Sequence, residues 1–186
     1  ATGEIEVEAK EVYRFCERTF RERRVRVHEI DWKNWKATDQ AVICFLFEDN
    51  QILLINKKRG LGAGKVNGPG GKCEAGETHE SAAIRETEEE IGLRPRSVEE
   101  RGRLLFQFLD GYALEVALFT SEEFDGELRE TPEAAPFWVS TDAIPYEKMW
   151  ADDILWLPRL LEGRNVRGRF LFDGDIMVDY AVSFDG

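Results

Sequence analysis

Short apolar runs recur along the chain between polar turns, and they predict strands. Two of them, residues 41–47 and 52–57, flank the polar residues 48–51 and predict a β-hairpin. Near the end of the chain, Asp173-Gly174 separates two further runs, and this dipeptide favours a tight hairpin turn. The segments predicted as strands are residues 25–30, 41–47, 52–57, 104–108, 113–120, 137–139, 166–172 and 176–182.

Three other segments have the spacing of helices. Residues 4–24 carry an apolar stripe at every third or fourth position, which predicts an amphipathic helix that packs either on its own domain or on a partner. Residues 149–161 predict a second helix, and residues 78–91 a third, with Thr78 as its N-cap. Strands and helices neither alternate strictly nor segregate, which indicates an α/β or α+β fold. The stripe consists of Val12, Phe15, Cys16 and Phe20.

Composition narrows the class of protein. The chain has 186 residues, which suits one domain, and its net charge of −12 argues against general binding to long nucleic acids or membrane surfaces. The longest apolar run, residues 41–47, is too short to span a bilayer. Three widely spaced cysteines suggest no disulfide framework, so we expect a reducing, cytoplasmic setting.

The third predicted helix is unusually acidic. It carries four glutamates within residues 86–90, and a helix places Glu86, Glu89 and Glu90 on one face. Like charges at this spacing destabilise a helix by ~0.2–0.5 kcal/mol per pair. Oxygen ligation of a divalent cation such as Mg²⁺ would offset the repulsion, whereas the alternative is a solvated acidic surface.

The order of residues around these acids is more specific than the acids alone. A glycine is followed after five residues by Glu, after seven more by Arg-Glu, after two more by Glu-Glu, and then by Gly and an aliphatic residue. This order resembles the signature of the Nudix hydrolase family. Thr87 is one departure, because the family usually has an aliphatic residue there. The matching positions are Gly71, Glu77, Arg85, Glu86, Glu89, Glu90, Gly92 and Leu93.

The resemblance implies a Nudix α/β/α sandwich with a mixed sheet. Residues 41–186 would form this domain, and residues 1–40 would be an N-terminal extension with a helix and a short strand. Four further segments are similar to the branch that hydrolyses oxidised purine nucleoside triphosphates such as 8-oxo-dGTP. These segments are residues 56–72, 131–138, 144–158 and 167–180.

The resemblance also implies catalytic and metal-binding roles. Glu86, Glu89 and Glu90 would hold Mg²⁺, or alternatively Mn²⁺, together with a backbone carbonyl around Gly70 or Gly71. Arg85 would orient the glutamates by charge-assisted hydrogen bonds. Either Glu89 or Glu90 would act as base or ligand, and Glu133, a loop acid near the metals in this branch, is the rival base.

Substrate-binding roles follow in the same way. Lys57 would lie near the triphosphate or sugar, Asn67, Asp152 and Asp153 would bind the base edge, and Trp150 would stack on the purine. Two adjacent aspartates in an apolar pocket repel, so one of them can hold a proton and donate it. Without the resemblance, the aspartates would be ordinary acids at a helix N-terminus and Trp150 an ordinary core residue. Three positions depart from the branch by replacing aromatic residues, and they are Leu61, Val66 and Pro69.

The expected function is therefore Mg²⁺-dependent hydrolysis of a purine nucleoside triphosphate to a monophosphate and pyrophosphate. One alternative keeps this chemistry but changes the substrate to an unmodified nucleotide, a nucleoside diphosphate conjugate or an RNA 5′-triphosphate. A second alternative is a nucleotide-binding module without catalysis. We expect a monomer or a weak dimer.

Overall fold

Strand β1 (Asp39–Glu48) is the central strand of the fold, because it pairs with three others. The computed structural model describes residues 25–185 of the chain. In this part, nine strands form one sheet in the order β11-β10-β6-β7-β1-β2-β3, with β4 also paired to β1 and β9 to β2. The pairs β1–β7 and β6–β10 are parallel and the others are antiparallel, so the sheet is mixed, as expected.

The longer strands lie where the sequence predicted them, although β6 begins earlier, at Glu99, and the short strands at residues 66–67, 70–72, 93–95 and 124–126 were not predicted. The hairpin of β1 and β2 pairs Phe47 with Ile52. Strands β10 and β11 are antiparallel, with Asp173 paired to Ile176, so the turn consists of Gly174 and Asp175 and lies one residue after the predicted Asp173-Gly174. A small second sheet pairs β5 with β8. The strands after β1 are β2 (Gln51–Lys57), β3 (Val66–Asn67), β4 (Gly70–Lys72), β5 (Leu93–Pro95), β6 (Glu99–Phe108), β7 (Ala113–Ser121), β8 (Phe124–Gly126), β9 (Ala134–Ser140), β10 (Asn165–Asp173) and β11 (Ile176–Asp185).

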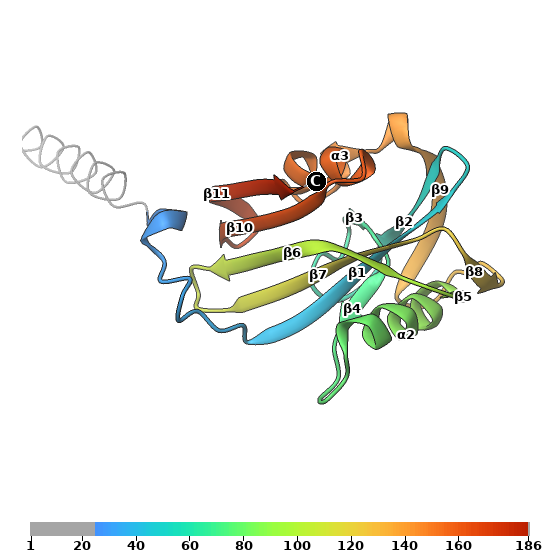
Figure 1. Ribbon diagram of the computed structural model, residues 1–186, viewed down its shortest axis with the longest axis horizontal. Helices are drawn as coiled ribbons and strands as arrows, with labels where there is room; N and C mark the ends of the chain where they lie inside the picture. Colours follow the sequence, from blue (N-terminus) through green and yellow to red (C-terminus); the bar gives the residue numbers. More distant parts are fainter. Residues whose placement is uncertain (1–24, 186) are drawn as a thin grey trace, which may run out of the picture.

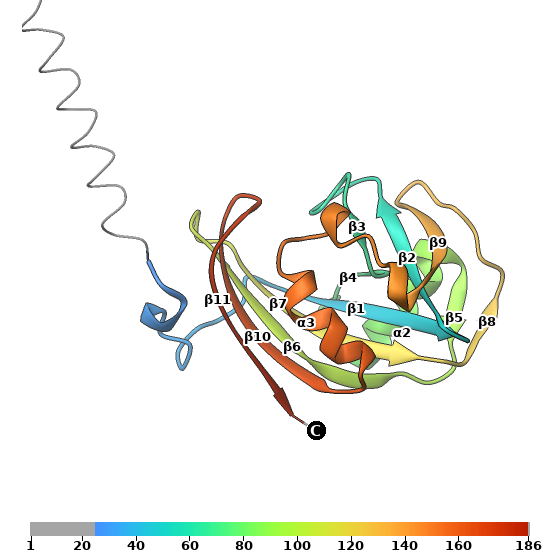
Figure 2. The same cartoon turned by 90° about the horizontal axis from the view of Figure 1, so that it is seen from above.

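Two helices cover opposite faces of the sheet, α2 (His79–Ile91) on one and α3 (Asp153–Leu161) on the other (Figure 1). Successive side chains of a strand point to opposite faces, so β1 contributes to both layers. Its Cys44 packs in the layer beneath α2, whereas Phe45 packs beneath α3 beside Trp156. Figure 2 shows α3 alongside the β10–β11 hairpin. The predicted α/β sandwich with a mixed sheet is confirmed.

Helix α2 has the predicted ends. Thr78 caps it by accepting the Ser81 N–H at 3.1 Å, and Gly92 ends it with a φ of 80°. A side chain at Gly92 would place its Cβ 2.5 Å from the Glu127 carbonyl oxygen, so glycine is required there for space as well as conformation. Thr87 is fully buried, and its hydroxyl donates to the Ala83 carbonyl at 2.7 Å. The threonine therefore packs like the aliphatic residue it replaces.

Two predicted boundaries are wrong. Residues 25–30 do not form a strand, because the 3₁₀ helix η1 (Val27–Glu29) lies there. The backbone N–H groups of Arg26 and Val27 donate to the carboxylates of Glu29 and Asp179. These two donors are therefore not available to pair with a neighbouring strand. The C-terminal helix begins at Asp153 and not at residue 149. The Asp153 carboxylate accepts the backbone N–H of Trp150 at 3.0 Å, and the helix starts after this turn.

The described part of the N-terminal extension packs on the sheet. Trp32 donates its indole N–H to the Val27 carbonyl at 2.6 Å and lies beneath the Arg169 guanidinium. Trp35 donates to the Gln107 side chain at 2.9 Å, which joins the extension to β6. The amphipathic helix predicted within residues 4–24 lies outside the described residues, and the domain boundary at residue 40 stays a prediction.

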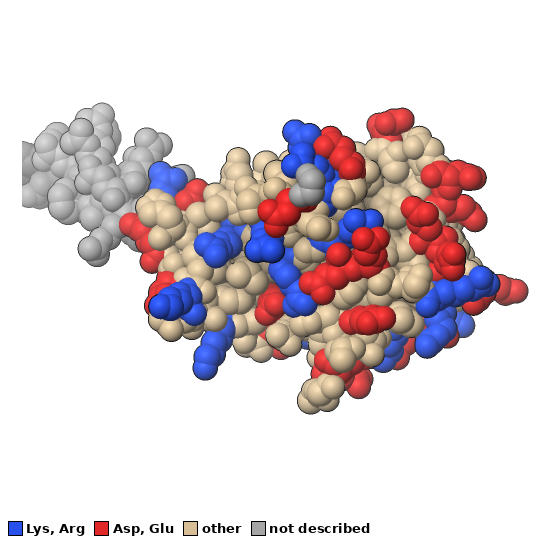
Figure 3. Space-filling view, viewed as in Figure 1, with Lys and Arg blue, Asp and Glu red and all other residues tan. Residues whose placement is uncertain are grey.

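The surface agrees with the mixed charge of the sequence. Lys and Arg side chains are interspersed with Asp and Glu on the face in Figure 3. No helix within residues 25–185 is long and apolar enough to cross a membrane. Cys44 and Cys73 are free thiols.

Candidate active site

Arg85 binds several acidic residues of the segment 71–93, which carries the Nudix-like signature and includes α2. It binds Glu77 through two parallel hydrogen bonds of 2.8 and 2.7 Å, and it also contacts Glu86 at 2.8 Å and Glu89 at 3.1 Å. These hydrogen bonds lower the pKa of Glu77 to about 2 and raise the pKa of Arg85. Charge-assisted pairs of this kind fix both distance and orientation. Arg85 therefore holds Glu86 and Glu89, two of the three acids predicted to share one face of α2.

Glu90 lies deeper than its neighbours. Only 3% of it is exposed, and one carboxylate oxygen accepts the Gly70 N–H at 2.8 Å. The other oxygen is 3.2 Å from Lys57 Nζ. Burial raises the pKa of Glu90, and the Lys57 ammonium and the Gly70 N–H partly oppose the rise. The sequence prediction placed Lys57 near the triphosphate; in the structure its ammonium lies beside Glu90.

Gly71 is the first residue of the Nudix-like signature. A Cβ at this position would lie 2.2 Å from Glu86 Oε2, so the missing side chain allows the Glu86 carboxylate to lie directly against the backbone of β4. The requirement is one of space, because the carboxylate and the strand backbone approach each other closely. This approach puts backbone atoms of residues 70 and 71 beside the acids.

The donor atoms of this cluster suit a hard divalent cation. Mg²⁺ prefers carboxylate and carbonyl oxygens and is usually bound by few protein ligands plus water and phosphate. The three acids of α2 and the backbone beside them supply such oxygens. Within residues 25–185 no three acidic, histidine or cysteine side chains converge to surround an ion; Arg85 and Lys57 bind the carboxylates instead. The oxygen donors of the site therefore fit a divalent metal ion, which would share the carboxylates with the Arg85 and Lys57 side chains.

Glu133, the rival base, lies on the loop before β9. Its carboxylate contacts Arg59, and its backbone carbonyl accepts the Lys58 N–H at 2.8 Å. The loop is joined to α2 because the Thr131 hydroxyl donates to the Glu90 carbonyl at 2.8 Å. The structure thus brings the loop to the end of the acidic helix but pairs the Glu133 carboxylate with a cation. The sequence places Arg59 in a basic run before the glycine-rich loop but does not indicate this contact.

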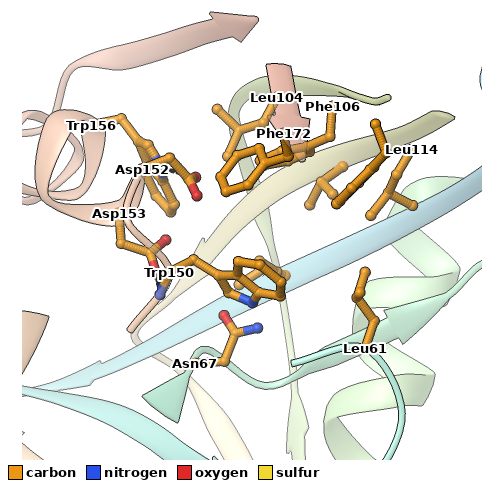
Figure 4. A pocket seen from close by; sticks show the side chains of 13 residues that line it. Leu61, Asn67, Leu104, Phe106, Leu114, Trp150, Asp152, Asp153, Trp156 and Phe172 are labelled. Carbon is orange, nitrogen blue, oxygen red and sulfur yellow. Dashed lines mark hydrogen bonds between the residues drawn. The ribbon is translucent and has the colours of Figure 1, made fainter. Parts of the chain in front are cut away.

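A pocket opens between the sheet and α3, on the face opposite α2, with a volume of about 80 Å³ (Figure 4). Figure 4 shows Asn67 from β3 beneath the Trp150 indole, with Asp152 and Asp153 approaching from the start of α3. All four predicted base-binding residues therefore line one pocket. Its remaining walls are apolar and are formed by Ile43, Leu61, Leu104, Phe106, Phe108, Leu114, Val116, Trp156 and Phe172.

Asp152 and Asp153 are almost completely buried, with 2% and 4% of each residue exposed. Asp152 accepts the indole N–H of Trp156 at 2.9 Å, and Asp153 accepts the backbone N–H of Trp150. Burial raises the pKa of Asp152 to about 6, and burial together with the Asp152 charge raises that of Asp153 well above its ordinary value. The pair therefore holds a proton near neutral pH. The second oxygen of Asp152, Oδ1, is buried and has no hydrogen-bond partner among the described residues.

Several residues of the pocket could not be assigned from the sequence. Trp156 donates its indole N–H to Asp152, one helical turn away. That i, i+4 spacing is the signal that could have indicated it. Phe106 and Phe108 alternate along one strand, which indicates a shared face, but the sequence does not show that Phe172 of β10 adjoins both.

A family model described as the NUDIX domain matches residues 37–160, two thirds of the chain. The chain belongs to the NUDIX family. This confirms the family inferred from residues 71–93, and the chain is a Nudix hydrolase.

Relatives of this Nudix chain are similar along most of its length. The chain is 41% identical over 142 residues to the Danio rerio protein named oxidized purine nucleoside triphosphate hydrolase, a match that covers 75% of this chain and 91% of the relative. The Mus musculus protein of the same name is 37% identical with the same coverage. Among solved structures, a MutT protein from Bacillus halodurans has a TM-score of 0.71 at 27% identity, over 78% of this chain and 97% of the other.

Proposed function

We propose that this Nudix hydrolase cleaves oxidised purine nucleoside triphosphates, such as 8-oxo-dGTP, to the monophosphate and pyrophosphate. The observation that carries the proposal is a proton-holding pair of buried aspartates, with one unpartnered oxygen, beside Trp150 and Asn67 in an otherwise apolar pocket. The names of the Danio rerio and Mus musculus relatives support the same substrate class.

The pocket suits a flat base with several polar edge atoms. A purine would stack on Trp150, and its edge would meet Asn67, which donates and accepts at once, and the aspartate pair. Because the pair holds a proton, it can present one donor and several acceptors. An oxidised purine gains an N–H donor where the normal base has an acceptor, so an unpartnered carboxylate oxygen such as Asp152 Oδ1 favours the oxidised form.

Divalent ions, Mg²⁺ in our proposal, would be held by Glu86, Glu89 and Glu90 with a carbonyl of residue 70 or 71. When bound, they would neutralise charge on the phosphate oxygens and lower the pKa of an attacking water. Arg85 keeps Glu86 and Glu89 in position, and Lys57 offsets the charge of buried Glu90.

The chain's own groups then divide the remaining work. A water attacks a phosphorus of the triphosphate chain, the P–O–P link between the α- and β-phosphorus breaks so that pyrophosphate leaves, and a carboxylate accepts the proton of the water. We propose Glu89 for this role, because 63% of its side chain is exposed, whereas both oxygens of Glu90 have partners. Glu133 is the alternative base, and it would have to leave Arg59 to act.

A substrate panel tests the proposal. Release of pyrophosphate and of the monophosphate would be measured with Mg²⁺ for 8-oxo-dGTP, dGTP, dATP, a pyrimidine triphosphate and ADP-ribose. We expect the highest kcat/KM for 8-oxo-dGTP, with preference over dGTP of at least about tenfold, as one extra edge hydrogen bond predicts. Equal or greater kcat/KM for ADP-ribose or the pyrimidine would overturn the substrate class. Absence of any hydrolysis would favour a binding module.

A further inference from the structure

Lys65 joins three separate segments beside Trp150, which lines the pocket. It lies between the glycine-rich residues 60–64 and β3, two positions before Asn67. Its ammonium is 4.8 Å from the centroid of the Trp150 ring and 3.2 Å from Asp175 Oδ2 in the β10–β11 turn. The side chain of Lys65 therefore holds the indole and the turn of a distant hairpin at the same time.

The backbone of Lys65 is held by hydrogen bonds on both sides, which fixes where its side chain begins. The Lys65 carbonyl accepts the Lys57 N–H at 3.0 Å, and its own N–H donates to the Gly62 carbonyl at 2.9 Å. Gly62 has a φ of 82°, and a Cβ there would lie 2.9 Å from Trp150 Nε1. The loop thus lies directly against the indole, and this close approach requires glycine.

The contact with Trp150 outweighs the ion pair with Asp175. Asp175 is 70% exposed at its side chain, and exposed ion pairs contribute little because water screens them. The Lys65 side chain is 27% exposed, and a cation over an indole gains strength as it is desolvated. Asp175 therefore directs the ammonium, and the cation–π contact restrains the ring.

We propose that Lys65 is a positioning residue for base binding, which holds Trp150 in the orientation that stacks on the purine. The inference rests on the proposed function for the identity of the ligand, but the restraint on Trp150 exists without substrate. Within residues 25–185, Lys65 forms no ion pair with the acids of α2, so it acts on binding of the base and not on the hydrolytic step.

Three variants test this role in the full chain. Lys65→Met keeps the aliphatic stem and removes the charge, Lys65→Arg keeps the charge, and Arg96→Met removes an exposed cation paired with Asp125 on the small second sheet. For the oxidised purine triphosphate, we expect Lys65→Met to raise KM about three- to tenfold with kcat unchanged. Lys65→Arg should keep KM near that of the original protein, and Arg96→Met should change neither KM nor kcat.

A readout without substrate separates this inference from the proposed function. The fluorescence of Trp150 is taken as the difference between each protein and its Trp150→Phe counterpart. Acrylamide should quench this fluorescence more strongly in Lys65→Met than in the original protein, and in Lys65→Arg the quenching should equal that of the original protein. Unchanged quenching and KM in Lys65→Met would overturn the positioning role, as would a fall in kcat alone. If Lys65→Met does not fold, Lys65→Gln replaces it, and the same rise in KM and in quenching is expected. Failure to hydrolyse any triphosphate with the quenching change intact would overturn only the proposed function.

Discussion

Arg85 and Glu77 are joined by two parallel hydrogen bonds, from Nε to Oε1 at 2.8 Å and from Nη2 to Oε2 at 2.7 Å. They lie eight residues apart in sequence, on either side of the start of α2. The pair connects the loop before the helix to the helix itself, while the remaining guanidinium nitrogen binds Glu86 and Glu89. One side chain thus determines both the local fold and the arrangement of the acids.

Arg85→Lys should lower both stability and activity, because an ammonium cannot make the parallel pair and reach Glu86 as well. We expect a loss of about 1–3 kcal/mol in the free energy of unfolding, measured with urea, and a lower kcat. Arg96→Lys is the matched control, since Arg96 also binds a carboxylate through Nε and Nη2, but both side chains are more than half exposed. It should change stability by less than about 1 kcal/mol. Equal losses in both variants would contradict the role given to Arg85.

The stability contributed by Glu77 should depend on pH in a known direction. Its folded pKa of about 2 lies below its ordinary value of 4.5, so the unfolded chain takes up this proton first. The contribution is therefore complete above about pH 5 and is lost as the pH falls toward 2. Unfolding measured from pH 2 to 7 should show a shallower acid limb in Glu77→Gln than in the original protein. Parallel curves would show that Glu77 is not the group responsible.

Asp152→Asn should make the protein more stable but a weaker binder of substrate. The folded pKa of Asp152, about 6, exceeds its ordinary value of 3.8, so the unfolded chain ionises first and stability falls as pH rises from about 4 to 6. Removing the charge should add about 1–3 kcal/mol at pH 7. KM for the oxidised purine should rise because an acceptor is lost. Denaturation at pH 4 and pH 7 checks the first effect, and a variant less stable at pH 7 would refute it.

Glu89→Gln should abolish most turnover and leave the fold intact. Loss of a general base typically lowers kcat by about 10²–10⁴. The side chain is largely exposed, and within residues 25–185 it binds only Arg85, so the melting temperature should change by no more than a few degrees. The comparison with Glu133→Gln, measured under the same conditions, assigns the base: the variant with the larger fall in kcat identifies it. Near-normal kcat in both would exclude both carboxylates as the base.

Much of the helix and strand pattern is predictable because it depends on neighbours in the chain. The cap at Thr78, the end at Gly92 and the hairpins follow from local residue types and spacing. The error at the start of the C-terminal helix comes from a local contact between Asp153 and Trp150, whereas the other error arises where a distant group intervenes. Residues 25–30 have the alternation of a strand, but Asp179, more than 150 positions away, takes the Val27 N–H.

The sequence by itself determined the acidic face of α2, since the helical repeat places Glu86, Glu89 and Glu90 together whatever lies around them. Only the tertiary structure decided what those acids bind and what the pocket is. Lys57 reaches Glu90, Arg59 takes Glu133, and Lys65 lies over Trp150 because separate strands and turns meet there. Burial of Asp152 and Asp153 likewise comes from the packing of α3 on the sheet. Residue spacing determines contacts within one element, whereas contacts between elements depend on strand order and register.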